Sequence, residues 1–165
     1  TDQGALVSKT QLEKVKFYVD LARQEGGKMI CGGGPPPKIS ERCKDGYFFQ
    51  PTIITDLDQS CRVNREEIFG PVVTITPFDK EEEVVAYAND TDYGLASSVW
   101  TQNVARAHRF AEQINAGTVW VNCWMIRDLR VPFGGMKQSG LGREGGEETM
   151  RFFTEPKNVC VAVKG

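Results

Sequence analysis

Three β-strand patterns alternate with two helical patterns from the middle of the chain onward, and this order restricts the fold more than any other feature. The predicted strands are residues 72–76, 96–101 and 118–121, which are rich in β-branched residues. The predicted helices are 79–88 and 103–115. Because a right-handed crossover brings successive strands side by side and parallel, this succession predicts an α/β fold with a mostly parallel sheet and flanking helices.

Capping residues set the predicted ends of three helices. A Ser or Asp followed three residues later by Gln or Glu is the pattern of a capping box, and a glycine after the last turn is the usual C-terminal cap. Ser8 with Gln11 marks the start of a helix predicted over 9–25, and Asp79 with Glu82 marks the start of one over 79–88. Gly117 marks the end of the helix predicted over 103–115. The apolar residues predicted to face the core are Leu12, Val15, Val19 and Ala22 in the first helix, and Val104, Ala107, Ala111 and Ile114 in the third.

The remaining elements are predicted from composition. Strands are expected at 28–31 and 47–55, a short helix at 144–153, and a terminal strand at 159–163 that pairs with its own sheet or with another subunit. The segment 132–144 contains four glycines, which allow positive φ and close backbone approach, so it is predicted to be a functional loop. Its glycine spacing does not match that of a P-loop or a dinucleotide fingerprint.

Charge and cysteine content exclude several classes of protein. The net charge of -2, with both signs interspersed, gives no basic face for nucleic acid or an anionic membrane, so neither is an expected partner. No apolar run approaches the roughly 20 residues that a membrane span requires and no signal-peptide pattern is found, so a cytoplasmic protein is expected. Five scattered cysteines and the single His108 predict neither a disulfide scaffold nor a metal site. His108 falls on a predicted helix and is expected to be a surface residue.

The hexapeptide Glu66-Glu67-Ile68-Phe69-Gly70-Pro71 places two carboxylates beside an aromatic ring. A carboxylate can accept two hydrogen bonds from the vicinal hydroxyls of a sugar, while the ring covers an apolar face of the ligand. The alternative is a surface turn with one buried phenylalanine.

Arg127 follows the predicted strand 118–121 and three apolar residues, Trp124, Met125 and Ile126. Ligands of parallel sheets bind beyond the carboxyl ends of the strands, and an arginine in an apolar pocket pairs bidentately with a carboxylate. The alternative is a surface ion pair of Asp128 with Arg127 or with Arg130.

Five segments in this order resemble the C-terminal part of the aldehyde dehydrogenase superfamily, from about Gly4 to the end of the chain. The segments are residues 4–8, 66–72, 89–96, 116–122 and 132–144. The resemblance implies NAD as cofactor, with Glu67 holding the nicotinamide ribose hydroxyls, Phe69 packing beside the nicotinamide, and Phe133 lining the substrate pocket. It also implies that 1–154 belongs to the catalytic domain and that 155–165 is a strand that joins subunits of a homotetramer.

Within the superfamily, residues 122–129 are similar to the 2-aminomuconic and 2-hydroxymuconic semialdehyde dehydrogenases. The position of Arg127 carries a substrate-facing arginine in that subgroup, which implies that Arg127 binds the remote carboxylate of an unsaturated acidic semialdehyde. Two alternatives remain: a dehydrogenase for simple neutral aldehydes, and a non-catalytic α/β module that binds a partner through its open sheet edge.

The family's nucleophilic cysteine stands in a Gly-Gln-x-Cys context, which none of the five cysteines has. Cys123 is the only cysteine beside the expected pocket, and the resemblance implies that it is a pocket-wall residue. The resemblance therefore implies that this chain contains no catalytic residue, and that the nucleophile, the general-base glutamate and the dinucleotide-binding domain lie upstream. The chain is expected to be a fragment that is inactive alone and binds NAD poorly.

Overall fold

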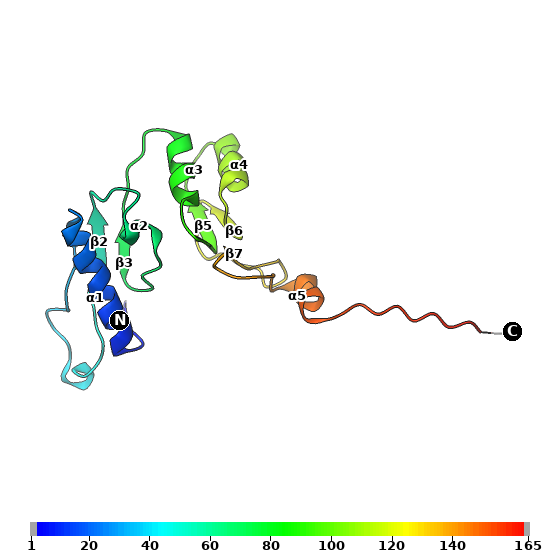
Figure 1. Cartoon of the computed structure of the whole chain (residues 1–165), viewed down its shortest axis with the longest axis horizontal. Coiled ribbons are helices and arrows are strands. Elements are labelled where there is room, and N and C mark those ends of the chain that lie inside the picture. The colour runs from blue at the N-terminus through cyan, green and yellow to red at the C-terminus, as the bar shows by residue number, and fades with distance from the viewer. Residues whose placement is uncertain (1–2, 164–165) are drawn as a thin grey trace. The chain divides into compact units, whose positions relative to one another are not determined.

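The computed structural model describes residues 3–163 and has two compact units, the first ending at Asp90 and the second beginning at Thr91 (Figure 1). Each unit combines helices with a small sheet that contains a parallel strand pair. The predicted α/β class is therefore confirmed, and the structure explains how each half of the chain is organised.

Unit 1 has a three-stranded sheet in the order β1-β2-β3, in which β1 and β2 are antiparallel and β2 and β3 are parallel. Helix α1 lies against this sheet (Figure 1). Its elements are α1 (Lys9–Gln24), β1 (Lys28–Cys31), the 3-10 helix η1 (Glu41–Cys43), β2 (Thr52–Thr55), α2 (Arg62–Arg65), β3 (Val72–Thr74) and α3 (Glu81–Asn89).

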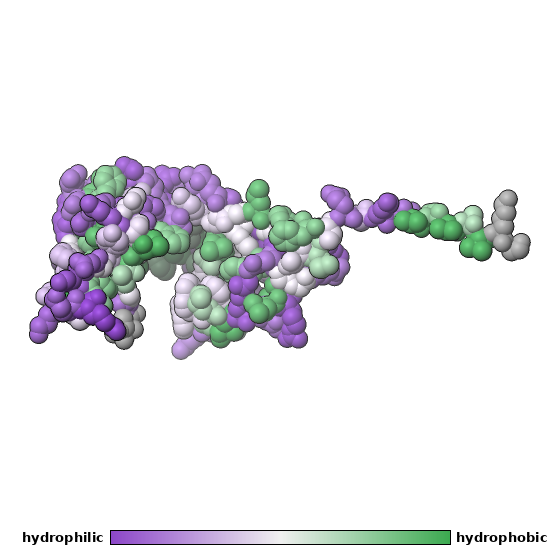
Figure 2. All heavy atoms as spheres, turned by 90° about the horizontal axis from the view of Figure 1, so that it is seen from below, coloured by the Kyte–Doolittle hydropathy of each residue, from purple (hydrophilic) through white to green (hydrophobic). Residues whose placement is uncertain are grey.

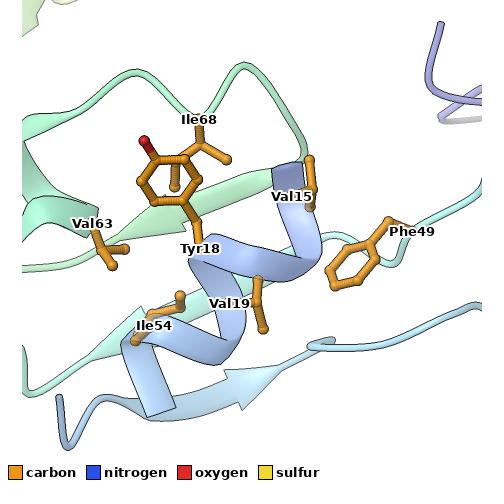
Figure 3. Packing of buried hydrophobic residues seen from close by; sticks show 8 residues of the cluster. Val15, Tyr18, Val19, Phe49, Ile54, Val63 and Ile68 are labelled. Carbon is orange, nitrogen blue, oxygen red and sulfur yellow. The ribbon is translucent and has the colours of Figure 1, made fainter. Parts of the chain in front are cut away.

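The core of unit 1 forms where α1 packs on β2 and on the segment that precedes β3 (Figure 3). Its buried side chains recur at helical spacing along α1, and burying each large one stabilises the fold by about 1.5–3 kcal/mol. Tyr18 belongs to this core although the sequence pattern did not include it, whereas Leu12 is only partly buried. The cluster consists of Val15, Tyr18, Val19, Ala22, Phe49, Ile54, Val63 and Ile68.

The helix starts differ in detail from the predicted capping boxes. Ser8 caps α1 as predicted, because its Oγ accepts a hydrogen bond from the amide of Gln11 at 3.1 Å. The Gln11 side chain does not complete the box, since it donates instead to a distant loop. At α3 the carboxylate of Glu83, and not that of Glu82, accepts hydrogen bonds from the amides of Asp79 and Lys80, at 3.1 and 3.2 Å. Helix α3 therefore begins later than predicted.

Unit 2 contains two separate strand pairs. β5 and β6 are parallel, with Ala96 opposite Thr118 and Val99 opposite Val121, and α4 packs on both strands. β4 and β7 are antiparallel, a pairing that the sequence did not predict. The elements are β4 (Tyr93–Gly94), β5 (Ala96–Val99), α4 (Val104–Gln113), β6 (Thr118–Val121), β7 (Met136–Lys137) and α5 (Gly146–Phe153).

The predicted parallel pairing is confirmed within unit 2, where β5 and β6, from the predicted strands 96–101 and 118–121, are neighbours. Within unit 1, β3, from the predicted strand 72–76, pairs in parallel with β2, which the sequence analysis did not predict. The predicted strand 47–55 is also shortened, since only Thr52–Thr55 forms β2. Sequence periodicity identified the strands but could not decide how they pair.

Two details of α4 were wrong as well. Its buried face consists of Ala107, Phe110 and Ile114, while Val104 and Ala111 are exposed. The C-cap is Ile114, so Gly117 does not end this helix.

Residues 154–163 form no strand with the described part of this chain. Val159, Val161 and Val163 are 69%, 77% and 87% exposed, and Figure 2 shows hydrophobic residues along this uncovered segment. Pairing with the chain's own sheet is therefore wrong, while pairing with another subunit stays a prediction. No helix within 3–163 is both long enough and apolar enough to cross a bilayer. The same residues bring together no group of three potential metal ligands.

Candidate functional site

Glu66, in unit 1, is held by two neighbouring elements. The Tyr18 hydroxyl of α1 donates a hydrogen bond to its Oε2 at 2.5 Å, and Arg62 of α2 donates from Nε and Nη2 at 2.6 and 2.9 Å. The hydrogen bonds from Arg62 and Tyr18 lower the pKa of Glu66 to about 2. Glu66 is therefore ionised, and its carboxylate is used in hydrogen bonds within the protein.

Glu67, directly beside it, is exposed and has no hydrogen-bond or ion-pair partner among the residues that the structure describes. Phe69 is 75% exposed and has a φ of 55°, a left-handed conformation that bulky residues rarely adopt. The side chain of Gln11 holds this turn, because its Nε2 donates to the carbonyl oxygens of Ile68 and Phe69 at 2.9 and 2.7 Å.

The side chains of this loop therefore alternate between the protein and solvent. Ile68 faces inward and is 9% exposed, the half-buried Glu66 is held against α1 and α2, and Glu67 and Phe69 are both exposed. The reading of Phe69 as a buried turn residue is wrong. A free carboxylate beside an exposed ring can bind a sugar diol and cover an apolar ring, which fits the nicotinamide riboside half of NAD.

In unit 2, polar side chains fix the chain where it leaves β6. Asn122 has a φ of 53°, and its side chain both accepts from and donates to the backbone of Thr101, at 2.7 and 2.8 Å. The Ser98 hydroxyl donates to the carbonyl of Cys123 at 2.7 Å. These bonds connect the carboxyl ends of β5 and β6 and set the direction of the segment that carries Arg127.

Arg127 lies on Phe133, with the guanidinium carbon 4.1 Å from the ring centroid. Its Nη2 donates to the Glu144 carboxylate at 2.5 Å, and Phe133 and Glu144 exchange two backbone hydrogen bonds of 2.8 Å. Within the described part of the chain, the Nε and Nη1 donors of Arg127 have no partner. The guanidinium is therefore oriented by a ring and one carboxylate but keeps donors for a second carboxylate.

The local ion pair of Arg127 with Asp128 does not form. Asp128 instead accepts from Arg130, whose Nε and Nη2 lie 2.9 and 2.5 Å from its two carboxylate oxygens, and these bonds lower the pKa of Asp128. Arg130 is 87% exposed, so it is a surface residue. Two arginines only three positions apart thus differ in environment, and Arg127 has the one suited to ligand binding.

The glycine-rich loop packs closely against neighbouring backbone and against an aromatic ring. A Cβ on Gly117 would lie 1.6 Å from the carbonyl oxygen of Gly134, and one on Gly142, which has a φ of 70°, would lie 2.3 Å from the Phe152 ring. These contacts account for the glycines without a bound phosphate. A hollow of about 330 Å³ lies beside the loop, with Phe133 and Glu144 in its wall.

The structure places the predicted residues in two groups, Glu67 with Phe69 in unit 1 and Arg127 with Phe133 in unit 2. Cys123 is half-buried, and His108 is exposed at the edge of a second hollow, of about 300 Å³. The sequence analysis missed the residues that orient these groups. Arg62 could have been found from its i,i+4 spacing to Glu66, but the others lie far away in the chain. The missed residues are Gln11, Tyr18, Arg62 and Glu144.

Comparison with known proteins identifies the family of the chain. The model of the aldehyde dehydrogenase family matches residues 1–159. The chain is 52% identical to the 2-aminomuconic semialdehyde dehydrogenase of Bos taurus over 97% of its length, and 52% identical to the 2-hydroxymuconic semialdehyde dehydrogenase of Pseudomonas sp. (strain CF600) over 96%. The structure of an aldehyde dehydrogenase from Bacillus cereus in complex with NAD+ superposes with a TM-score of 0.90 at 44% identity, covering 99% of this chain and 32% of that one.

These matches cover only part of the related proteins. The chain spans 33% of the Bos taurus enzyme and 32% of the Pseudomonas enzyme. The family model matches nearly the whole chain, the sequence identity is near one half, and the backbone is closely similar. The chain belongs to the aldehyde dehydrogenase family.

Proposed function

We propose that this chain contributes the cofactor-binding loop and the substrate-binding wall of an NAD-dependent dehydrogenase for an acidic semialdehyde. The substrate class is 2-aminomuconic or 2-hydroxymuconic semialdehyde, which is oxidised to the diacid. The observation that carries this proposal is the Arg127 guanidinium, stacked on Phe133 with unused donors. The similarity to semialdehyde dehydrogenases supports it.

Arg127 binds the carboxylate at the far end of the substrate. The Phe133 ring lies against one face of the guanidinium and Glu144 binds one of its nitrogens, so the direction of the free donors is set before substrate arrives. A planar carboxylate can then pair with two parallel N–H groups. Because little side-chain freedom remains to be lost, this orientation lowers the entropic cost of binding.

Glu67 and Phe69 bind the cofactor. The free carboxylate of Glu67 accepts hydrogen bonds from the two hydroxyls of the nicotinamide ribose, and the Phe69 ring packs beside the nicotinamide. NAD, when bound, would supply the hydride acceptor that oxidation of the aldehyde requires. The bonds from Gln11 to the backbone of Ile68 and Phe69 keep the ring in place while the cofactor binds.

The nucleophilic cysteine and the general-base glutamate belong to other parts of the enzyme, because no cysteine of this chain stands in a Gly-Gln-x-Cys context. Cys123 is a wall residue in this account. The apolar segment 159–163 pairs with a second subunit, which would cover the exposed valines at its end.

A substrate comparison tests the proposal in the full-length dehydrogenase that contains this chain. We expect kcat/KM for 2-hydroxymuconic semialdehyde to exceed that for a neutral unsaturated aldehyde of similar length by about tenfold or more, because a hydrogen-bonded charge pair contributes about 1.5–3 kcal/mol. NADH formation provides the assay. Equal values for the two aldehydes would contradict an acidic substrate and favour a dehydrogenase for neutral aldehydes.

A further inference from the structure

We propose that Glu66, held by Tyr18 and Arg62, is a positioning residue that fixes the neighbouring Glu67 for the cofactor. This inference rests on the proposed role of Glu67, and it extends that role to residues outside the cofactor-binding loop. Tyr18, Arg62 and Glu66 are called the clamp below. Their contribution to NAD binding is exerted through Glu67.

The first argument is geometric. Glu66 has an extended backbone, with φ -97° and ψ 149°, so neighbouring side chains point to opposite sides. Holding Glu66 against α1 and α2 therefore directs Glu67 outward. Because the two residues are chemically identical, only their partners determine which carboxylate is presented.

The second argument is that the clamp is anchored in the core. Tyr18 is 7% exposed and packs with the buried side chains of α1, so its hydroxyl has a fixed position (Figure 3). Arg62 approaches from α2 and also lies over the Phe17 ring, with 5.6 Å from its guanidinium carbon to the centroid. Glu66 is thus held from two directions by three hydrogen bonds, and one bond alone would leave it free to turn.

The third argument is electrostatic. The cofactor carries a negatively charged pyrophosphate, and two uncompensated carboxylates would repel it more than one. Arg62 neutralises Glu66 by a bidentate contact, which leaves Glu67 as the uncompensated charge of the pair. Lys14 is the other cation that acts on Glu66. The low pKa of Glu66 agrees with its being the carboxylate that is paired with a cation.

Steady-state kinetics of the full-length dehydrogenase test the clamp, with KM for NAD and KM for the aldehyde measured separately. Arg62→Ala and Glu66→Gln are each expected to raise KM for NAD by roughly fivefold and to leave KM for the aldehyde unchanged. Arg62→Lys should recover part of the loss, since it restores a cation four residues from Glu66. Tyr18→Phe removes one hydroxyl without a change of shape and should have a smaller effect in the same direction.

The matched control is Arg151→Ala, which breaks an exposed i,i+4 ion pair with Glu147 on α5, where Arg151 Nη2 and Glu147 Oε1 are 2.7 Å apart. It should leave both KM values unchanged. If Arg62→Ala and Glu66→Gln change KM for NAD no more than Arg151→Ala does, the clamp has no positioning role and the inference is overturned.

A second measurement separates this inference from the proposed function. Glu67→Gln alone tests the cofactor role of Glu67, and an unchanged KM for NAD would contradict that role directly. If Glu67→Gln raises KM for NAD, Arg62→Ala should add little in the Glu67→Gln background, because both changes act on the same contact. An equal effect of Arg62→Ala in both backgrounds would show that Arg62 acts by another route, and the inference would be wrong although the role of Glu67 stands.

Discussion

The Arg127 guanidinium lies 4.1 Å above the centre of the Phe133 ring, and Phe133 pairs through its backbone with Glu144, the residue that binds Arg127. Arg127, from the segment after β6, is thereby joined to Phe133 and Glu144 of the glycine-rich loop. The ring removes water from one face of the guanidinium without supplying a counter-charge. This arrangement is the basis of substrate selection in our account.

The first prediction concerns this ring. Phe133→Leu keeps an apolar side chain but removes the π-face, and a cation–π contact contributes about 0.5–2 kcal/mol, so we expect KM for an acidic semialdehyde to rise by about threefold. KM for a neutral aldehyde should rise less, because that substrate does not use Arg127. Kinetics with both substrates provide the measurement. Equal increases would mean that Phe133 only shapes the pocket.

The second prediction concerns the packing of the glycine-rich loop. Gly117→Ala would place a methyl group 1.6 Å from the carbonyl oxygen of Gly134, so backbone must move, and we expect a loss of about 2–4 kcal/mol in the free energy of unfolding. Gly34→Ala is the control, since nothing lies within 4 Å of a Cβ there. Urea unfolding of both variants tests this. A Gly117→Ala protein as stable as the control would show that the close backbone contact does not exist.

The third prediction concerns pH. The folded-state pKa of Glu66 is about 2, below the value of about 4.3 for an unfolded chain, so the unfolded state binds more protons between these values. The stability that Glu66 contributes is therefore present above about pH 4.3 and is lost as the pH falls toward about 2. The difference in free energy of unfolding between wild type and Glu66→Gln should shrink over this window. Denaturant unfolding at several pH values measures it.

A background variant controls that experiment. Arg62 is the main cause of the low pKa, so in Arg62→Ala protein the Glu66→Gln change should show a weaker pH dependence. The same pH dependence with and without Arg62 would contradict the assigned cause.

Local signals in the sequence were sufficient to locate α1, α3, α4 and α5, but not the short helix α2 or the buried face of α4. Ser8 caps α1, and Val15, Val19 and Ala22 are buried at the spacing that predicted them. Strand pairing was not predictable in the same way, because a strand's apolar residues say which face is buried and not which neighbour it joins. The parallel pairing of β3 with β2 in unit 1 was for this reason not predicted.

The candidate site shows the same division between local and distant information. The local pattern drew attention to Glu66 and Glu67 without distinguishing them, since the Tyr18 that binds Glu66 lies 48 positions away, and only the family resemblance singled out Glu67. The local pattern offered Asp128 as a surface partner of either Arg127 or Arg130, and the pair with Arg130 is the one that forms. The structure instead joins Arg127 to Glu144, 17 positions along the chain. Apart from the i,i+4 contact of Arg62 with Glu66, the contacts that orient these residues are tertiary, and no local pattern encodes them.

The most direct test of the central claim compares two arginines that lie three positions apart. In the full-length dehydrogenase, Arg127→Ala should raise KM for an acidic semialdehyde by about tenfold or more, since a hydrogen bond to a charged group contributes about 1.5–3 kcal/mol. It should leave KM for a neutral aldehyde nearly unchanged, and Arg130→Ala, which affects only the surface pair with Asp128, should change neither. Equal effects of Arg127→Ala on both aldehydes, or equal effects of the two variants on the acidic one, would contradict the account.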